Sequence, residues 1–166
     1  MGKSLKARCQ GMVAAMDELR EALLGVEPCE DDAERRLDRF LEAAHSAGIE
    51  RSELGTEAPE VLRSAVAKAP YVAQLLIRSP RRLLRTASDP YLRREKPKAV
   101  LEAELTERLP APGVLDDDDF ATALRQFRAD EMARLGFREL SMGTPLEVGR
   151  ELANLADVCF DAAIRH

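Results

Sequence analysis

The stretch from Asp119 to Leu140 has charged residues where a helix normally buries apolar ones. Read at about 100° per residue, its large apolar residues fall on one stripe, namely Phe120, Leu124, Phe127 and Leu135. Glu131 and Arg138 lie near the centre of this stripe. Arg128 and Arg134 lie at its two edges, where either can pair with Glu131 along the helix. Because an unmatched buried charge is costly, the four residues either form a structural ion-pair network or meet a missing domain or partner protein.

The composition favours helices throughout the chain. Apolar residues make up 45% and charged residues 33%, aromatics are only 4%, and Trp is absent. Unbranched side chains such as Ala, Leu, Arg and Glu lose little freedom in a helix, and they are abundant here. The sequence therefore predicts an all-α fold, a bundle of about six to eight helices without a convincing strand.

The expected organisation is a single helical domain over residues 1–166, which is a common size for one domain. Residues 1–50 are expected to form an N-terminal helical hairpin, and residues 49–57 read as a loop and as the best internal boundary. The first helix is indicated by apolar residues that alternate steps of four and three: Leu5, Cys9, Met12, Met16, Leu19 and Leu23. This Leu5–Leu23 seam suits core packing, and a homodimer through it is the alternative.

Capping and proline signals place the remaining helices. Expected starts are Asp31–Asp32, Pro59, Pro70, Ser79–Pro80, Asp89–Pro90, Pro97 and a capping box over Thr144–Glu147. Gly48 is a natural residue to end the helix that starts at Asp31. Residues 71–77 are apolar enough for a buried strand, but the flanking prolines favour a short helix.

The last helix is expected to bury one apolar stripe. Its members at helical spacing are Val148, Leu152, Leu155, Cys159 and Ala163.

The charge distribution limits the classes of partner. A net charge of -5 argues against a general nucleic-acid binder, which needs cations to replace the counterions on phosphate. The segment from Arg78 to Lys98 is nevertheless basic. Its first four arginines form a candidate patch for an acidic partner, with a solvated helical face as the alternative: Arg78, Arg81, Arg82 and Arg85.

No catalytic or metal-binding motif is recognised. A Gly-rich phosphate loop, HExxH and Cys-x-x-Cys are all missing. The acidic run Asp116–Asp119 suits an N-cap and the helix dipole better than a Mg²⁺ or Ca²⁺ site, because it lacks the ligand spacing of an EF-hand. No run approaches the roughly 20 apolar residues of a membrane span, and three cysteines at no ligand spacing suit reduced thiols. We therefore expect a cytoplasmic protein with no catalytic residue and no metal of its own.

Three segments resemble a known family in the expected order. LRQFRADEMARLGFREL from Leu124 to Leu140 and LANLADVCFDAAI from Leu152 to Ile164 look like the N-terminal part of bacterial glutamine synthetase adenylyltransferase/deadenylylase. APYVAQLLIRSPRRLL from Ala69 to Leu84 is similar to an upstream family segment, with Ala69 in place of Ser. The matching residues in the first segment are Leu124, Arg125, Phe127, Arg128, Glu131, Met132, Arg134, Arg138 and Leu140, while Glu139 replaces Asp. The resemblance covers about residues 58–166, and residues 1–57 match no family pattern.

The resemblance implies a supporting role. In the family a nucleotidyltransferase core follows the helix that ends in Ala-Ala, and its Asp-x-Asp pair binds two Mg²⁺ ions. Asp116-Asp117-Asp118 lies before the Arg-rich helix, so no catalytic role is carried over to it. The chain is thus expected to be a non-catalytic helical region that needs no cofactor, whereas Mg²⁺ and ATP belong to the full-length enzyme. Its implied partners are glutamine synthetase or the missing nucleotidyltransferase domain, and the alternative is a stand-alone protein-protein interaction module.

Overall fold

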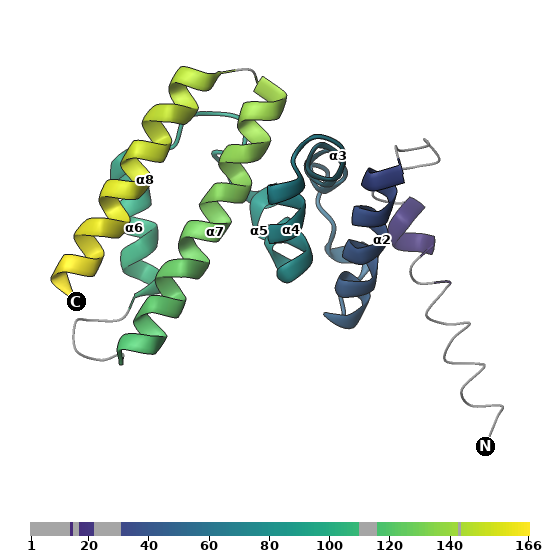
Figure 1. Ribbon diagram of the computed structural model, residues 1–166, viewed down its shortest axis with the longest axis horizontal. Coiled ribbons are helices and arrows are strands. Elements are labelled where there is room, and N and C mark those ends of the chain that lie inside the picture. Colours follow the sequence, from purple (N-terminus) through teal and green to yellow (C-terminus); the bar gives the residue numbers. More distant parts are fainter. Residues whose placement is uncertain (1–13, 15–16, 22–30, 110–115, 143) are drawn as a thin grey trace. The chain divides into compact units, whose positions relative to one another are not determined.

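The computed structural model describes residues 14, 17–21, 31–109, 116–142 and 144–166. All regular elements within these ranges are helical, which confirms the predicted all-α fold (Figure 1). None of the helices described is both long enough and apolar enough to cross a bilayer.

The contacts divide the chain into two compact units, Met1–Ser88 and Asp89–His166. The internal boundary therefore lies after Ser88 and not in the loop 49–57, where the sequence suggested it. The reason is that the helices before and after that loop pack on each other. The single domain expected over residues 1–166 stays a prediction.

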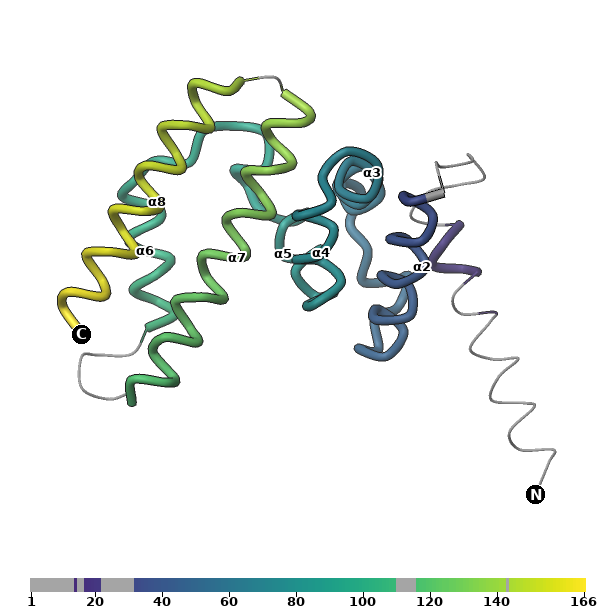
Figure 2. Tube along the Cα trace, in the orientation of Figure 1, coloured from purple at the N-terminus to yellow at the C-terminus, as the bar shows by residue number. Residues whose placement is uncertain are grey.

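The first unit is built from short helices punctuated by proline. They are α2 (Asp31–Ser46), the 3₁₀ helix η1 (Arg51–Glu53), α3 (Ala58–Lys68), α4 (Pro70–Arg78) and α5 (Arg81–Ser88). Helix α2 packs against α3 and α4, and α3 also packs against α5 (Figure 2). Residues 71–77 lie in α4 and bury Val72, Ala73, Leu75 and Leu76, so the helix reading of this segment is confirmed.

Gly48 ends α2 as predicted. Its φ of 65° is in the left-handed region, which suits a residue without a Cβ. The N–H of Gly48 donates to the carbonyl of His45 at 3.0 Å, and the N–H of Ile49 donates to that of Ala44 at 3.0 Å. These two bonds are those of a Schellman motif, and they satisfy carbonyls that the helix end would otherwise leave unpaired.

The predicted N-terminal seam is described only in part. Residues 14 and 17–21 are helical, and Leu19 is buried. The other members of the Leu5–Leu23 seam lie outside the described residues, as do residues 1–13, 15–16 and 22–30 of the hairpin expected over residues 1–50. The homodimer through the seam therefore stays a prediction.

The second unit is a bundle of three helices. They are α6 (Lys98–Arg108), α7 (Asp117–Met142) and α8 (Pro145–Arg165). Figure 1 shows α7 and α8 running in opposite directions with α6 beside them. Their buried apolar core consists of Leu101, Leu105, Phe127, Leu135, Val148, Leu155 and Val158.

The buried stripe of α8 differs from the predicted one. Val148 and Leu155 are buried as expected, but Leu152 is 38% exposed and Ala163 is also exposed. Glu151 occupies the predicted apolar face instead, with Val158 following it. The helix is rotated relative to the prediction because Glu151 has charged partners inside the unit.

A helix predicted to begin at Asp89–Pro90 is not formed. The Asp89 carboxylate accepts a hydrogen bond from the N–H of Tyr91 at 2.7 Å, which caps a turn only. The chain then stays irregular until Pro97, the N-cap residue of α6. This path carries the Lys96 side chain into the interior, where its ammonium group has three carboxylate partners.

Candidate functional site

Three of the four charged residues singled out on α7 are inside the protein. Glu131 is 2% exposed, and Arg134 and Arg138 are each 1% exposed. Arg128, in contrast, is exposed. The helix therefore separates the predicted set into an inward group of three and one outward arginine.

Arg134 links α7 to two other parts of the second unit. Its Nε donates to Glu131 at 2.9 Å on the same helix, and its Nη2 donates to Glu151 of α8 at 2.6 Å. Its Nη1 donates to the backbone carbonyl of Tyr91 at 3.2 Å. A buried charge-assisted contact of this kind is short and directional, so the planar guanidinium fixes the separation of α7, α8 and the segment before α6.

Arg138 repeats the connection one turn further along α7. Its Nη2 donates to Glu147 at 2.8 Å, and its Nη1 forms an ion pair with Glu151.

Because Glu147 pairs with Arg138, the predicted capping box of α8 is wrong. The hydroxyl of Thr144 makes no side-chain cap bond and is buried without a hydrogen-bond partner, whereas Pro145 stands in the first turn as predicted.

Lys96 is the third cation of the cluster, and its side chain is fully buried. Its Nζ lies 2.8 Å from Asp89, 2.9 Å from Glu104 and 2.8 Å from Glu131. Its backbone N–H donates to Glu151 at 3.0 Å. Through this residue the irregular segment before α6 is joined to all three helices of the unit.

We call this set the buried ion-pair network. Its members are Asp89, Lys96, Glu104, Glu131, Arg134, Arg138, Glu147 and Glu151. The most deeply buried members are the three cations together with Glu131 and Glu151, and Asp89, Glu104 and Glu147 close the network toward solvent. Every one of these charges therefore has a partner of opposite sign, the condition under which burying charges is tolerable.

The surroundings of Lys96 favour its charged form. Burial alone lowers the pKa of the Lys96 ammonium, but the charge of Glu131 and hydrogen bonds to Asp89, Glu131 and Glu104 outweigh that effect. The pKa of Lys96 consequently lies above its ordinary value. The Lys96 ammonium therefore stays charged at neutral pH.

Sequence reasoning missed two central members of the network. Lys96 was grouped with a basic surface segment, and Glu151 was passed over because a leucine follows it at a position that also fits the stripe. A signal was present for Glu151, since it lies three residues after Val148 and four before Leu155.

The candidate patch for an acidic partner does not form one open surface. Arg82 is only 5% exposed and donates to the carbonyl of Leu75 at 2.5 Å. Arg81 is exposed and pairs with Glu53 at 3.2 Å. Arg78 and Arg85 are also exposed. The structure therefore brings Arg82 into the protein and ties Arg81 to η1.

The acidic run acts as a helix start. The carboxylate of Asp116 accepts a hydrogen bond from the N–H of Asp119 at 2.8 Å, as an N-cap residue does, which confirms the predicted role. In the part of the chain that the structure covers, no three His, Cys, Asp or Glu side chains are grouped as they would be around a metal ion. The network carboxylates do not suit Mg²⁺ either, because ammonium and guanidinium groups already bind them.

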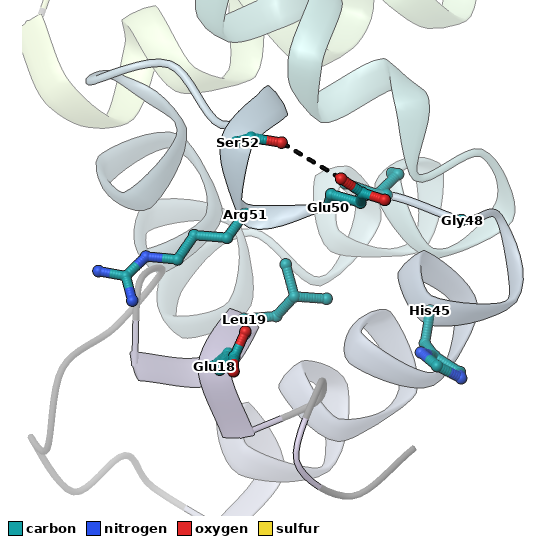
Figure 3. A pocket seen from close by; sticks show the side chains of 8 residues that line it. Glu18, Leu19, His45, Gly48, Glu50, Arg51 and Ser52 are labelled. Carbon is teal, nitrogen blue, oxygen red and sulfur yellow. Dashed lines mark hydrogen bonds between the residues drawn. The ribbon is translucent and has the colours of Figure 1, made fainter. Parts of the chain in front are cut away.

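A cavity of about 420 Å³ lies in the first unit (Figure 3). It is lined by Glu18, Leu19, His45, Gly48, Ile49, Glu50, Arg51 and Ser52. Ser52 and Glu50 are hydrogen-bonded to each other at 3.4 Å, and Figure 3 shows the His45 ring and the Arg51 guanidinium pointing in opposite directions. Small-molecule sites need polar groups that converge, and the described residues that line this cavity do not converge in this way.

Comparisons with known proteins agree on one family. The family model described as glutamate-ammonia ligase adenylyltransferase matches residues 59–166. A bifunctional glutamine synthetase adenylyltransferase/adenylyl-removing enzyme of Pseudomonas aeruginosa is 30% identical over 138 residues. That alignment covers 82% of this chain but only 14% of the relative's length. No solved structure matches the chain.

Proposed function

Because the chain belongs to the glutamate-ammonia ligase adenylyltransferase family, we propose that it is a non-catalytic helical region of a glutamine synthetase adenylyltransferase-like protein. In this role it packs against or supports a nucleotidyltransferase domain that is absent from this chain. The bifunctional relative is named for both adenylyl transfer and adenylyl removal. The proposal gives this chain neither chemical step, and it places the protein in the cytoplasm with glutamine synthetase.

Three charged residues of α7 support this proposal, because they are buried and paired inside the second unit. Glu131, Arg134 and Arg138 belong to the segment that resembles the family, and the last two have buried carboxylate partners on α8. A guanidinium held by buried carboxylates cannot also bind the phosphates of a nucleotide without breaking those pairs. The motif is therefore suited to fixing the positions of α7 and α8.

Mg²⁺ and ATP belong to the proposed whole enzyme. Carboxylates that hold Mg²⁺ must present oxygens to the ion, and those of the network present theirs to cations of the protein. The proposal therefore assigns the binding of both groups to the nucleotidyltransferase domain.

The catalytic part of the proposal is tested with the chain alone. Purified protein is incubated with glutamine synthetase, Mg²⁺ and labelled ATP, and AMP incorporation is followed by mass spectrometry. We expect no transfer above a sample without the chain. Time-dependent AMP incorporation that scales with the amount of chain would refute the non-catalytic role.

The supporting part is tested with the Pseudomonas aeruginosa enzyme after removal of its matched segment. We expect the chain to bind this shortened enzyme in a fluorescence titration. Arg128 is the outward member of the motif, and reversing an exposed interface charge weakens binding modestly. Arg128→Glu is thus expected to weaken binding about threefold to tenfold. Lys68→Glu serves as the matched control, because Lys68 is an exposed residue at the end of α3 in the other unit. Absence of binding by the unaltered chain would count against the supporting role.

The second candidate function is a stand-alone protein-protein interaction module. It is favoured by large apolar side chains that α8 exposes, among them Phe160 at 68%. Such a module could bind its partner through charged or through apolar contacts, and a pull-down at low and at high salt distinguishes the two. A partner bound through arginines is lost at high salt, and one bound through apolar contacts is retained.

A further inference from the structure

One side of α8 is apolar and exposed along nearly the whole helix. Six residues at helical spacing form it, and we call them the outer face: Leu146, Gly149, Ala153, Ala156, Phe160 and Ile164. Leu146 is 82% exposed, and Phe160 and Ile164 are each 68% exposed. Scattered apolar side chains on a surface need no explanation, but a contiguous stripe of this kind marks an interaction site.

The outer face has large side chains at both ends and small ones between them. Leu146 stands at one end, Phe160 and Ile164 stand at the other, and the two alanines lie at the middle. If a second α8 is laid antiparallel with the twofold axis near the alanines, Leu146 lies opposite the partner's Ile164. Gly149 then lies opposite the partner's Phe160. We propose that the outer face binds a second copy of this chain in this antiparallel, twofold-symmetric arrangement.

Gly149 provides space for the partner's aromatic ring. A Cβ added at Gly149 would meet no other atom of its own chain within 4 Å, so the glycine has no packing role inside the unit. Opposite a large side chain, however, it forms a notch. Ala153 and Ala156 at the centre allow the two helix backbones to approach closely, because the distance between helix axes depends on the side chains at the contact.

The charges beside the outer face are complementary in the same arrangement. Arg150 and Asp161 are exposed and lie on the same side of the stripe, and Arg150 also pairs with Glu95 of its own chain at 2.9 Å. In an antiparallel pair the same flanks of the two helices face each other, so Arg150 lies near the partner's Asp161. The symmetry repeats this contact, as in any twofold interface. In a parallel twofold pair the flanks that carry Arg150 and Asp161 lie on opposite sides of the interface, so this contact is not made.

The size of the outer face predicts a weak dimer. The 18 steps from Leu146 to Ile164 span about 27 Å at roughly 1.5 Å per residue. A strip of that length along one helix buries less than the roughly 800 Å² per partner of a standard interface. We therefore expect dissociation constants of roughly 10⁻⁵ to 10⁻⁴ M.

The test is sedimentation velocity of the 166-residue chain over a concentration series that brackets this range. We expect a monomer–dimer equilibrium, and Phe160→Asp is expected to weaken it at least tenfold because it places a charge in the apolar contact. Tyr71→Asp is the matched control, since Tyr71 is an aromatic residue of α4 that is 55% exposed and lies in the other unit. It should leave the equilibrium unchanged.

Two further variants, Gly149→Leu and Asp161→Arg, distinguish this geometry from nonspecific association. Gly149→Leu fills the notch but improves helix propensity, so it should weaken the dimer at least tenfold while the monomer remains helical by circular dichroism. Asp161→Arg places an arginine beside the partner's Arg150 and should also weaken the dimer. A monomer at all concentrations, or a dimer indifferent to Phe160→Asp and Gly149→Leu, would overturn the inference. Either result leaves the proposed supporting function standing, because that function does not depend on the dimer.

Discussion

Replacing Lys96 with methionine is expected to lower the free energy of unfolding by about 3–5 kcal/mol. The ammonium group is fully buried among Asp89, Glu104 and Glu131. Methionine has a similar length but no charge, so Glu131 would remain buried with its negative charge and one partner fewer. The change is measured from urea unfolding followed by the helical circular dichroism signal.

Lys98→Met provides the matched control for this variant. Lys98 lies two residues away and makes one ion pair with Asp157 at 3.1 Å, but its side chain is 37% exposed. An exposed pair contributes at most about 1 kcal/mol, so Lys98→Met should be nearly neutral. Equal effects of the two substitutions would show that burial of Lys96 does not matter.

The pKa of Lys96 adds a pH signature to the same comparison. That pKa is raised above its ordinary value in the folded protein, so the ion pairs of Lys96 contribute their full stability below about pH 10.4. The contribution is lost as the pH rises through the folded pKa. The stability difference between the unaltered protein and Lys96→Met should therefore be constant near neutral pH and shrink at strongly alkaline pH.

Glu151→Leu is expected to have an effect of similar size, about 3–5 kcal/mol. Glu151 is fully buried on the apolar side of α8 and accepts from Arg134 and from the N–H of Lys96. Leucine would fill the space well, but it would leave the Arg134 and Arg138 guanidinium groups without their shared carboxylate. The measurement is again the urea midpoint and slope.

Glu147→Leu is the matched control for Glu151→Leu, because it removes another glutamate of α8 that is not fully buried. Glu147 also pairs with Arg138, but its side chain is 41% exposed, so water can replace the pair and the cost should be near 1 kcal/mol. If Glu151→Leu were as mild as Glu147→Leu, α8 would not be held by its buried carboxylate.

Much of the fold could be predicted because its signals are local. Prolines, caps and helical spacing act over a few residues. They correctly indicated the helices described in both units and the turn at Gly48, although the signal at Asp89–Pro90 marked a turn only. The periodicity of α7 also identified Glu131 and Arg138 as inward-facing. The family resemblance from Ala58 onward was confirmed by the match over residues 59–166.

The pairing inside the network could not be predicted, because its contacts join distant parts of the chain. Glu151 is 17 residues from Arg134 and 55 residues from Lys96. No local pattern reports such separations. Arg128 was grouped with the network by position on the helix, yet a residue at the edge of a stripe can turn either way. The rotation of α8 and the missing capping box follow from the same long-range pairs.

The central claim is that the buried charges of α7 hold the second unit together by pairing with α8. A double-mutant cycle with Arg134→Met and Glu151→Leu tests it most directly, because Arg134 and Glu151 approach within 2.6 Å. We predict that the two losses are not additive and that the coupling free energy is about 2–3 kcal/mol. Additive losses, with coupling below about 0.5 kcal/mol, would contradict the account.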